Sequence, residues 1–237
     1  MKLSAPIFQL KRRAKLMARN NDVPLNEALD QIAQEEGFAR WSMLSSRMSS
    51  GPLSETVLSR LDAGDLLLLA GRPGQGKTML GLQLLIDAAR DGRKAFLFTL
   101  ELTEKQAGKY LQSLERETGG FANQVQIVTA DEISADYIID RMSGSRPGTV
   151  AVIDYLQALD QQRSKPVLSE QLRALGDFAR RSGCVLGFIS QIDRSFDPES
   201  KRLPDIRDIR LPNFVDLGLF NRACFLHDGE AQLQDVA

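Results

Sequence analysis

The chain contains the stretch Gly71-Arg72-Pro73-Gly74-Gln75-Gly76-Lys77-Thr78, a complete G-x-x-x-x-G-K-[ST] pattern. The apolar run 66–70 before it is typical of a buried strand, and apolar residues at helical spacing follow it as far as Arg90. A strand, a glycine-rich loop and a helix in this order can cradle phosphate, because backbone N–H groups and the helix dipole point at one anion. The alternative is a glycine-rich turn with a chance Gly-Lys-Thr, and the strand-loop-helix context argues against it.

The cradle predicts ATP and Mg²⁺ as ligands. The ATP-binding residues are then the whole loop: Gly71, Arg72, Pro73, Gly74, Gln75, Gly76, Lys77 and Thr78. The Lys77 ammonium reaches the β- and γ-phosphates, and the Thr78 hydroxyl is a ligand of Mg²⁺.

Composition narrows the class of protein only slightly. Of the 237 residues, 43% are hydrophobic and 26% charged, which is ordinary for a globular protein with a substantial core. No apolar stretch is long enough to span a membrane and no signal peptide is recognisable, so we expect a cytoplasmic protein. Cys184 and Cys224 have apolar neighbours and are interpreted as reduced core residues. His227 is the only histidine, which excludes histidine-based triads and multi-histidine metal sites.

The character of the sequence changes near residue 50. Three short helical patterns precede Ser49-Ser50-Gly51-Pro52, and alternating strands and helices follow it. We therefore expect a helical N-terminal module at 1–50 and a doubly wound, mainly parallel α/β domain at 51–237. Strands are predicted at 66–70, 95–100, 125–129, 150–153, 185–190 and 219–226, and helices at about 76–90, 104–118, 132–142 and 169–182.

Three further polar residues are predicted to end parallel strands. Asp154 follows the apolar run 149–153, and a carboxylate there can hold Mg²⁺ beside Thr78. Glu101 follows the run 95–100 and is a candidate general base for the attacking water. Its alternative role is a helix N-terminal charge, since Thr103 and Gln106 form a plausible capping box. Gln191 can hydrogen-bond the γ-phosphate or its water and report hydrolysis to the next loop.

Together these segments resemble the RecA-like ATPase domain of DnaB-type replicative helicases. The resemblance covers about residues 55–230 and rests on the order and spacing of five short segments: Gly71 to Thr78, Thr99-Leu100-Glu101, Val152 to Gln157, Ile189-Ser190-Gln191 and Asp208-Ile209-Arg210. It implies a hexameric ring that binds ATP between subunits, with Glu101 as base and Gln191 as sensor. It also implies that the loops after Asp154 and Gln191 face single-stranded DNA, and that the strand 185–190 lies between the strands ending at Ala70 and Asp154.

The sequence departs from the family at two places. The resemblance calls for a basic hairpin with a trans-acting arginine after the last matched strand, and residues 230–237 contain no Lys or Arg. We therefore expect slow turnover by the isolated chain, because such an arginine accelerates hydrolysis about 10³- to 10⁵-fold. Arg222 is a candidate substitute, and an ordinary strand-edge arginine is the alternative. The family's N-terminal helical domain is replaced by some fifty residues.

The distribution of charged residues does not decide whether the partner is DNA or a protein. Residues 1–20 hold six basic residues and no acidic one, which suits either phosphate contact or a solvated helix face. The loop 192–210 is electrically balanced, so it offers little affinity from counterion release. Two functions follow: a DnaB-like motor acting in DNA replication, recombination or repair, or an ATP-dependent switch that regulates assembly with a protein partner.

Overall fold

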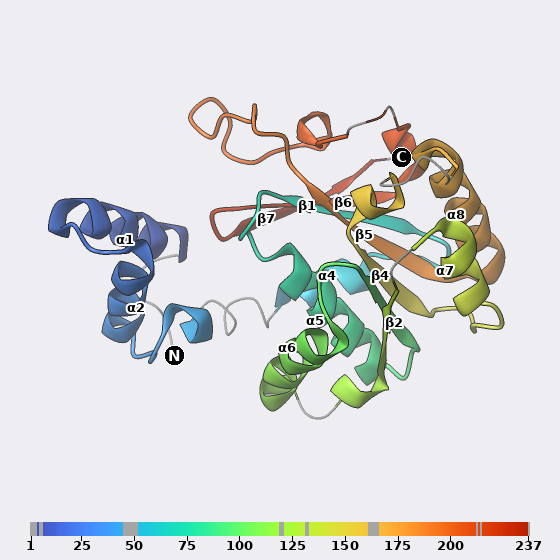
Figure 1. Cartoon of the computed structure of the whole chain (residues 1–237), viewed down its shortest axis with the longest axis horizontal. Helices are drawn as coiled ribbons and strands as arrows, with labels where there is room; N and C mark the ends of the chain where they lie inside the picture. Colours follow the sequence, from blue (N-terminus) through green and yellow to red (C-terminus); the bar gives the residue numbers. More distant parts are fainter. Residues whose placement is uncertain are drawn as a thin grey trace.

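The computed structural model describes residues 4, 7–44, 52–118, 121–130, 133–160, 166–211, 213 and 215–236. In this part of the chain a seven-stranded sheet has the order β3-β2-β4-β5-β1-β6-β7 (Figure 1). The strands are β1 (Leu66–Gly71), β2 (Ala95–Thr99), β3 (Val125–Thr129), β4 (Val150–Asp154), β5 (Val185–Gln191), β6 (Arg222–His227) and β7 (Glu230–Asp235). All neighbouring pairs are parallel except β6 and β7. The doubly wound α/β class is confirmed, and β5 lies between β1 and β4 as the resemblance implies.

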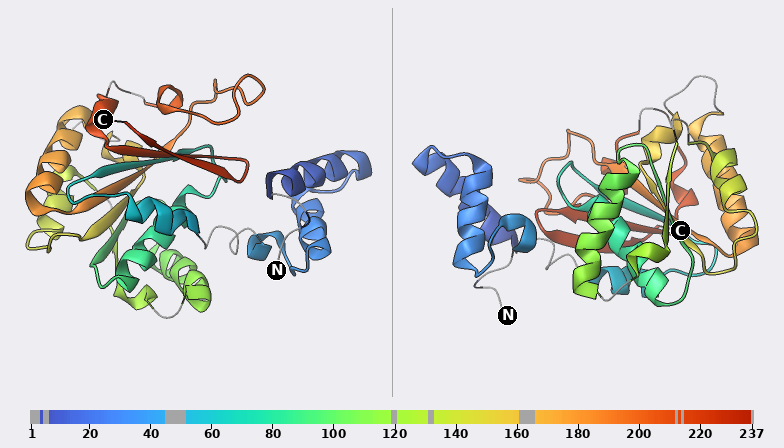
Figure 2. Two further views of the ribbon diagram at one scale, coloured as in Figure 1. Left: turned by 180° about the vertical axis from the view of Figure 1, so that it is seen from behind. Right: turned by 60° about the horizontal axis from the view of Figure 1, so that its bottom comes forward.

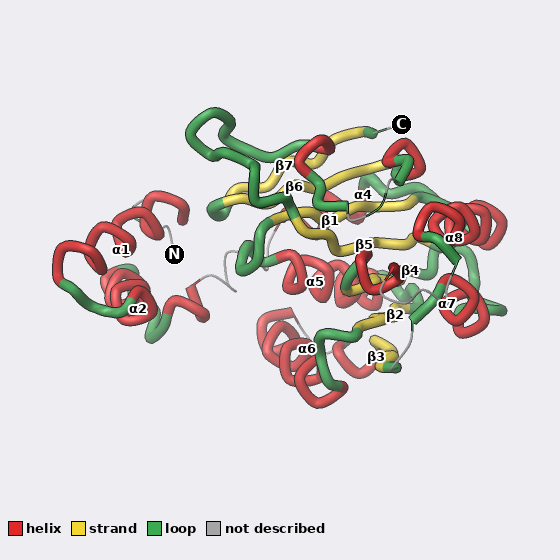
Figure 3. The backbone as a smooth tube through the Cα atoms, turned by 45° about the horizontal axis from the view of Figure 1, so that its top comes forward, coloured by secondary structure: helices red, strands yellow, loops and turns green. Residues whose placement is uncertain are grey.

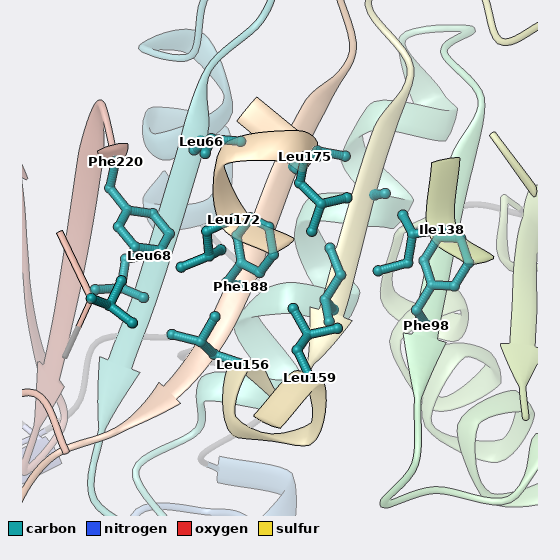
Figure 4. Packing of buried hydrophobic residues seen from close by; sticks show 14 of the residues in the cluster. Leu66, Leu68, Phe98, Ile138, Leu156, Leu159, Leu172, Leu175, Phe188 and Phe220 are labelled. Carbon is teal, nitrogen blue, oxygen red and sulfur yellow. The ribbon is translucent and has the colours of Figure 1, made fainter. Parts of the chain in front are cut away.

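Helices cover both faces of the sheet (Figure 3). One face carries α4 (Pro52–Ser59), α5 (Lys77–Arg90) and α6 (Glu104–Thr118), and the other carries α7 (Ala135–Arg141) and α8 (Leu168–Ser182). Each central strand contributes to the hydrophobic core on both faces of the sheet, because its successive side chains point to opposite faces. In β1, Leu66 and Leu68 pack toward α8, while Leu67 and Leu69 pack toward α5. Figure 4 shows the core on the face covered by α7 and α8, where Phe188 and Phe98 of the sheet lie near Leu172 and Ile138 of the helices.

The N-terminal helices have a small core of their own. Helices α1 (Ile7–Asn21) and α2 (Leu25–Glu35) pack together, and Leu44 joins them. The buried residues of this small core are Leu10, Ala14, Ala28, Ile32, Ala33 and Leu44. Trp41 donates its backbone N–H to Asp30 at 2.8 Å, which ties the end of this segment to α2. The three expected helical patterns therefore form one group of helices, beside the sheet in Figure 2.

Several boundaries differ from the expectation. The predicted strand 219–226 is instead a 3₁₀ turn at Leu217–Leu219 followed by β6 from Arg222, because Asp216 accepts the N–H of Gly218 and holds the turn. Helix α7 is shorter than the predicted 132–142, because Ser134 caps it and accepts the N–H of Tyr137. Helix α4 and strand β7 are additions to the predicted elements. Among the described helices none is long and apolar enough to cross a membrane.

Candidate nucleotide site

The carboxyl ends of the central strands bring the predicted site residues to one edge of the sheet. In the strand register Gly71 lies beside Gln191, and Asp154 lies between Thr99 and Ile189. Glu101 follows Thr99 by two residues, at the end of β2. Ligands of doubly wound folds bind outside these carboxyl ends. The sheet therefore gathers the loop 71–78, Asp154, Glu101 and Gln191, which are dispersed over about half of the sequence, at the edge where doubly wound folds bind their ligands.

The glycine-rich loop has the conformation of a phosphate cradle. Gly74 and Gly76 have φ values of +77° and +88°, which residues with a Cβ rarely adopt, and α5 begins directly afterwards at Lys77. The Lys77 ammonium donates to the carbonyl oxygen of Arg72 at 3.0 Å inside the loop, and the residue is only 9% exposed. Burial lowers the pKa of Lys77, and the carboxylates of Asp154 and Glu101 oppose that effect. A buried cation held inside the curled loop is suited to bind phosphate oxygens.

Asp154 and Thr78 place two oxygen-bearing side chains next to each other. The Thr78 hydroxyl donates to Asp154 Oδ2 at 3.1 Å, and Asp154 is 1% exposed. Burial, together with the nearby Glu101 charge, raises the pKa of Asp154 to about 6, while the Thr78 hydrogen bond and Lys77 act against the rise. The other oxygen, Oδ1, is buried without a hydrogen-bond partner among the described residues. Mg²⁺ prefers oxygen ligands, so a hydroxyl beside a carboxylate with one unpartnered oxygen fits it.

Glu101 is exposed at the edge of this pair. Its backbone N–H donates to the Thr99 hydroxyl at 3.2 Å, and its charge acts on both Asp154 and Lys77. The predicted capping box is also present: Thr103 accepts the N–H of Gln106 at 3.3 Å, and Gln106 accepts the N–H of Thr103 at 2.9 Å. The box starts α6 without Glu101, so that carboxylate is left facing solvent beside the site.

Helix α5 is seated closely on the strands that carry Asp154 and Gln191. Gly81 faces them, and a Cβ there would lie 3.0 Å from Val152 and 3.3 Å from Ile189. Each of these two residues precedes a site residue by two positions on its strand. The absence of a side chain at Gly81 therefore lets the helix that starts at Lys77 approach β4 and β5.

A set of hydrogen bonds closes the base of the loop 192–210 after Gln191, and sequence reasoning did not predict these contacts. Ile192 and Ile209 form an antiparallel bridge, and the N–H of Arg210 donates to the carbonyl of Gln191 at 2.8 Å. The Gln157 amide donates to the Ser190 hydroxyl at 3.1 Å and to the Arg210 carbonyl at 2.7 Å. The segment after Asp154 is thus tied to both ends of the loop 192–210. Most of these residues lie in the segments Val152 to Gln157, Ile189-Ser190-Gln191 and Asp208-Ile209-Arg210 noted in the sequence, but those patterns do not specify which residues bond to one another.

Three cations of the loop 192–210, Lys201, Arg202 and Arg207, form ion pairs within this chain. Lys201 lies 2.5 Å from Asp205 and 2.8 Å from Asp208, and Arg207 lies 2.7 Å from Asp205. Arg202 pairs with Glu230 of β7 at 2.5 Å. Hydrogen bonds from Arg207 and Lys201 hold the pKa of Asp205 far below its usual range. The balanced charge seen in the sequence is therefore a set of specific contacts, three of them within the loop.

Arg222 lies away from the nucleotide edge. It begins β6 and pairs with Leu67 of β1 in the strand register, while Leu226 at the other end of β6 pairs with Gly71. Its side chain lies 3.2 Å from Asp235 of β7. Arg222 thus lies on an inner strand between β1 and β7 and is paired within the chain, so it is neither at the nucleotide edge nor on an edge strand.

The fold and the site define a P-loop ATPase of the RecA-like class. The model of the family described as "ATPase: KaiC" matches residues 29–208. The chain belongs to this KaiC-like ATPase family.

Within this class the chain is similar to the ATPase domain of DnaB-type helicases. It is 27% identical to the replicative DNA helicase DnaB of Synechocystis over 79% of this chain and 25% of the relative, and 24% identical to that of Mycoplasma pneumoniae over 86% and 53%. The chain thus spans about a quarter and about half of these relatives. Two solved structures share the fold at 20% identity: a DnaB-like replicative helicase studied with primase (TM-score 0.57; 92% of this chain, 65% of that one) and a separately solved ATPase domain (0.56; 86% and 83%).

Proposed function

We propose that this protein binds ATP with Mg²⁺ at the loop 71–78 and hydrolyses it by attack of water on the γ-phosphate. The observation that carries the proposal is the Thr78–Asp154 pair, 3.1 Å apart, with an unpartnered buried carboxylate oxygen beside the Lys77 ammonium. A buried carboxylate with a raised pKa lowers the stability of the protein, so its retention beside a phosphate-binding loop is best explained by a bound cation.

Each residue has a distinct task in this reaction. The backbone of the loop 71–78 and the Lys77 ammonium bind the phosphates, and Lys77 exchanges the Arg72 carbonyl for phosphate oxygens. Thr78 and Asp154 would hold Mg²⁺, which neutralises charge on the β- and γ-oxygens when it is bound. Glu101 accepts a proton from the attacking water, and its solvent-facing position lets that water reach it. Gln191 hydrogen-bonds the γ-phosphate or the water, at the root of the loop 192–210.

The first biological role is that of a DnaB-like motor on single-stranded DNA. It is supported by similarity to two replicative helicases over most of this chain. In this role 51–237 is the ATPase domain, several copies assemble with ATP between them, and the N-terminal helices at 1–50 form an accessory module. The basic α1, where Lys15 and Arg19 are exposed, then adds phosphate contacts.

The second role is that of an ATP-dependent switch acting on a protein partner. It is favoured by the internal pairing of Lys201, Arg202 and Arg207, because cations already paired release few counterions from DNA. The same pairing, with that of Arg222, leaves few free charges to act on a neighbouring subunit's ATP, and turnover by the chain alone is expected to be slow.

The ATPase rate, measured with and without single-stranded DNA and alongside the mass in solution with ATP, separates these roles. A motor gives DNA-stimulated turnover by an oligomer, and the stimulation falls steeply as salt rises. A switch gives slow, DNA-independent turnover with a nucleotide-dependent change of assembly. Lys77→Ala serves as the inactive control in both arms, and absence of ATP binding by the parent protein would contradict the proposal itself.

A further inference from the structure

The side chains of Arg72 and Gln75 point out of the phosphate cradle and anchor it to two other loops. Arg72 donates to the carbonyl of Arg194 at 3.0 Å and to that of Phe196, both in the loop 192–210. Gln75 accepts the N–H of Asp228, in the turn between β6 and β7, at 2.7 Å. The cradle is thus held from two sides, by residues that the G-x-x-x-x-G-K-[ST] pattern leaves unspecified.

An aromatic cluster fills the space between these anchors. The Arg72 guanidinium lies 5.5 Å from the centre of the Phe196 ring, and Phe196 meets His227 edge to face at 5.2 Å. Phe196 is 4% exposed although it belongs to a long loop, so the loop is packed down at this point. In Figure 1 the loop 192–210 and the β6–β7 turn lie at the same end of the sheet as the turn that follows β1.

We propose that Arg72 is a positioning residue that couples nucleotide binding to docking of the loop 192–210. The Arg72 backbone is part of the phosphate cradle, and its guanidinium holds the loop. The two ligands do not compete, because phosphate uses backbone N–H groups and Lys77 while the loop uses only the guanidinium and the Phe196 ring. The coupling is therefore positive: a docked loop preorganises the cradle, and by reciprocity bound nucleotide holds the loop docked.

Tryptic cleavage within the loop reports this coupling. The proposal rests on the proposed ATP binding, so nucleotide affinity is measured first, with a fluorescent ATP analogue. Mass spectrometry then follows cleavage after Arg194, Lys201, Arg202 and Arg207, with and without Mg²⁺ and a non-hydrolysable ATP analogue. In the parent protein we expect the nucleotide to slow cleavage at least about fivefold, the lower end of ordinary coupling between sites.

Arg72→Ala should remove this protection, speed cleavage without nucleotide, and weaken nucleotide affinity by a similar factor. Arg72→Lys keeps the charge but not the planar guanidinium beside the Phe196 ring, so we expect partial rescue. The matched control is Arg180→Ala, which breaks an exposed ion pair with Asp177 on α8 and should leave protection and affinity unchanged.

Two outcomes are distinguishable. No nucleotide binding by the parent protein would overturn the proposed function. Binding by the parent protein, with equal protection of the loop in Arg72→Ala and an unchanged affinity, would overturn the coupling alone. Circular dichroism of Arg72→Ala shows whether the variant is folded. If it is not, Phe196→Leu replaces it, since that variant removes the ring under Arg72 and is expected to halve the protection or more.

Discussion

Replacing Asp154 by asparagine should stabilise the metal-free protein while removing its response to Mg²⁺. The Asp154 pKa rises from 3.8 to about 6 because the carboxylate is buried. At about 1.4 kcal/mol per unit, the ionised carboxylate destabilises the fold by about 3 kcal/mol well above pH 6. Asparagine has the same shape and an amide oxygen that can accept the Thr78 hydrogen bond, but it carries no charge.

The sign of the pH dependence follows from the raised pKa. The destabilisation is absent below the unfolded-state value of 3.8, develops between 3.8 and about 6, and is complete above that, because the folded protein holds the proton more tightly. The stability advantage of Asp154→Asn should therefore be about 3 kcal/mol at pH 8, about half as large at pH 5, and absent near pH 3.

Urea unfolding in the presence of a chelator measures this difference. Asp87→Asn is the matched control, because Asp87 is also buried but is bonded by Gln83 at 2.9 Å and paired with Arg90 at 3.2 Å, so its loss should destabilise. With Mg²⁺ and ATP the parent protein should gain stability that Asp154→Asn does not. An Asp154→Asn variant less stable than the parent protein at pH 8, or a difference independent of pH, would refute the reasoning.

Three other changes test separate parts of the site and the core. Lys77→Ala should lose most of the stabilisation by ATP, which is about 2.7 kcal/mol at a hundred times the dissociation constant; an unchanged thermal shift would contradict the phosphate-binding role. Glu101→Gln should keep ATP affinity and lose about 10²- to 10⁴-fold in turnover, whereas Glu104→Gln, an exposed neighbour, should hydrolyse ATP at the parental rate. Leu172 is fully buried on α8, so Leu172→Ala should lower the free energy of unfolding in urea by about 2–5 kcal/mol without changing turnover per folded molecule. A smaller loss would mean that neighbouring side chains move in to fill the space left by Leu172.

The central strands and the cradle could be predicted because their signals are local. Apolar runs that end in Gly71, Asp154 and Gln191 need only the period of a buried strand and a phosphate-binding pattern. Strand β7 was missed because the sequence of Glu230–Asp235 lacks β-branched and aromatic residues. The preceding Asp228-Gly229, with φ values of +47° and +83°, is a hairpin turn that the dipeptide itself could have signalled.

The contacts around the cradle could not be predicted in the same way. Arg72 and Arg194 are 122 positions apart in the chain, and Gln75 and Asp228 are 153 apart. Only the strand order brings these loops to one edge of the sheet. The sequence around an arginine or a glutamine does not indicate which distant group its side chain will hydrogen-bond. The raised pKa of Asp154 is likewise a result of burial by several elements together.

The close packing of α5 on the sheet determines which parts of the molecule can move when the state of the site changes. With Gly81 against Val152 and Ile189, the helix that starts at Lys77 cannot shift relative to the strands ending in Asp154 and Gln191 without a steric clash or a void. The phosphate lysine, the candidate metal carboxylate and the candidate sensor therefore move as one block. Under the proposed function, loss of the γ-phosphate is therefore expected to change the positions of the segments that leave this block and not the packing within it.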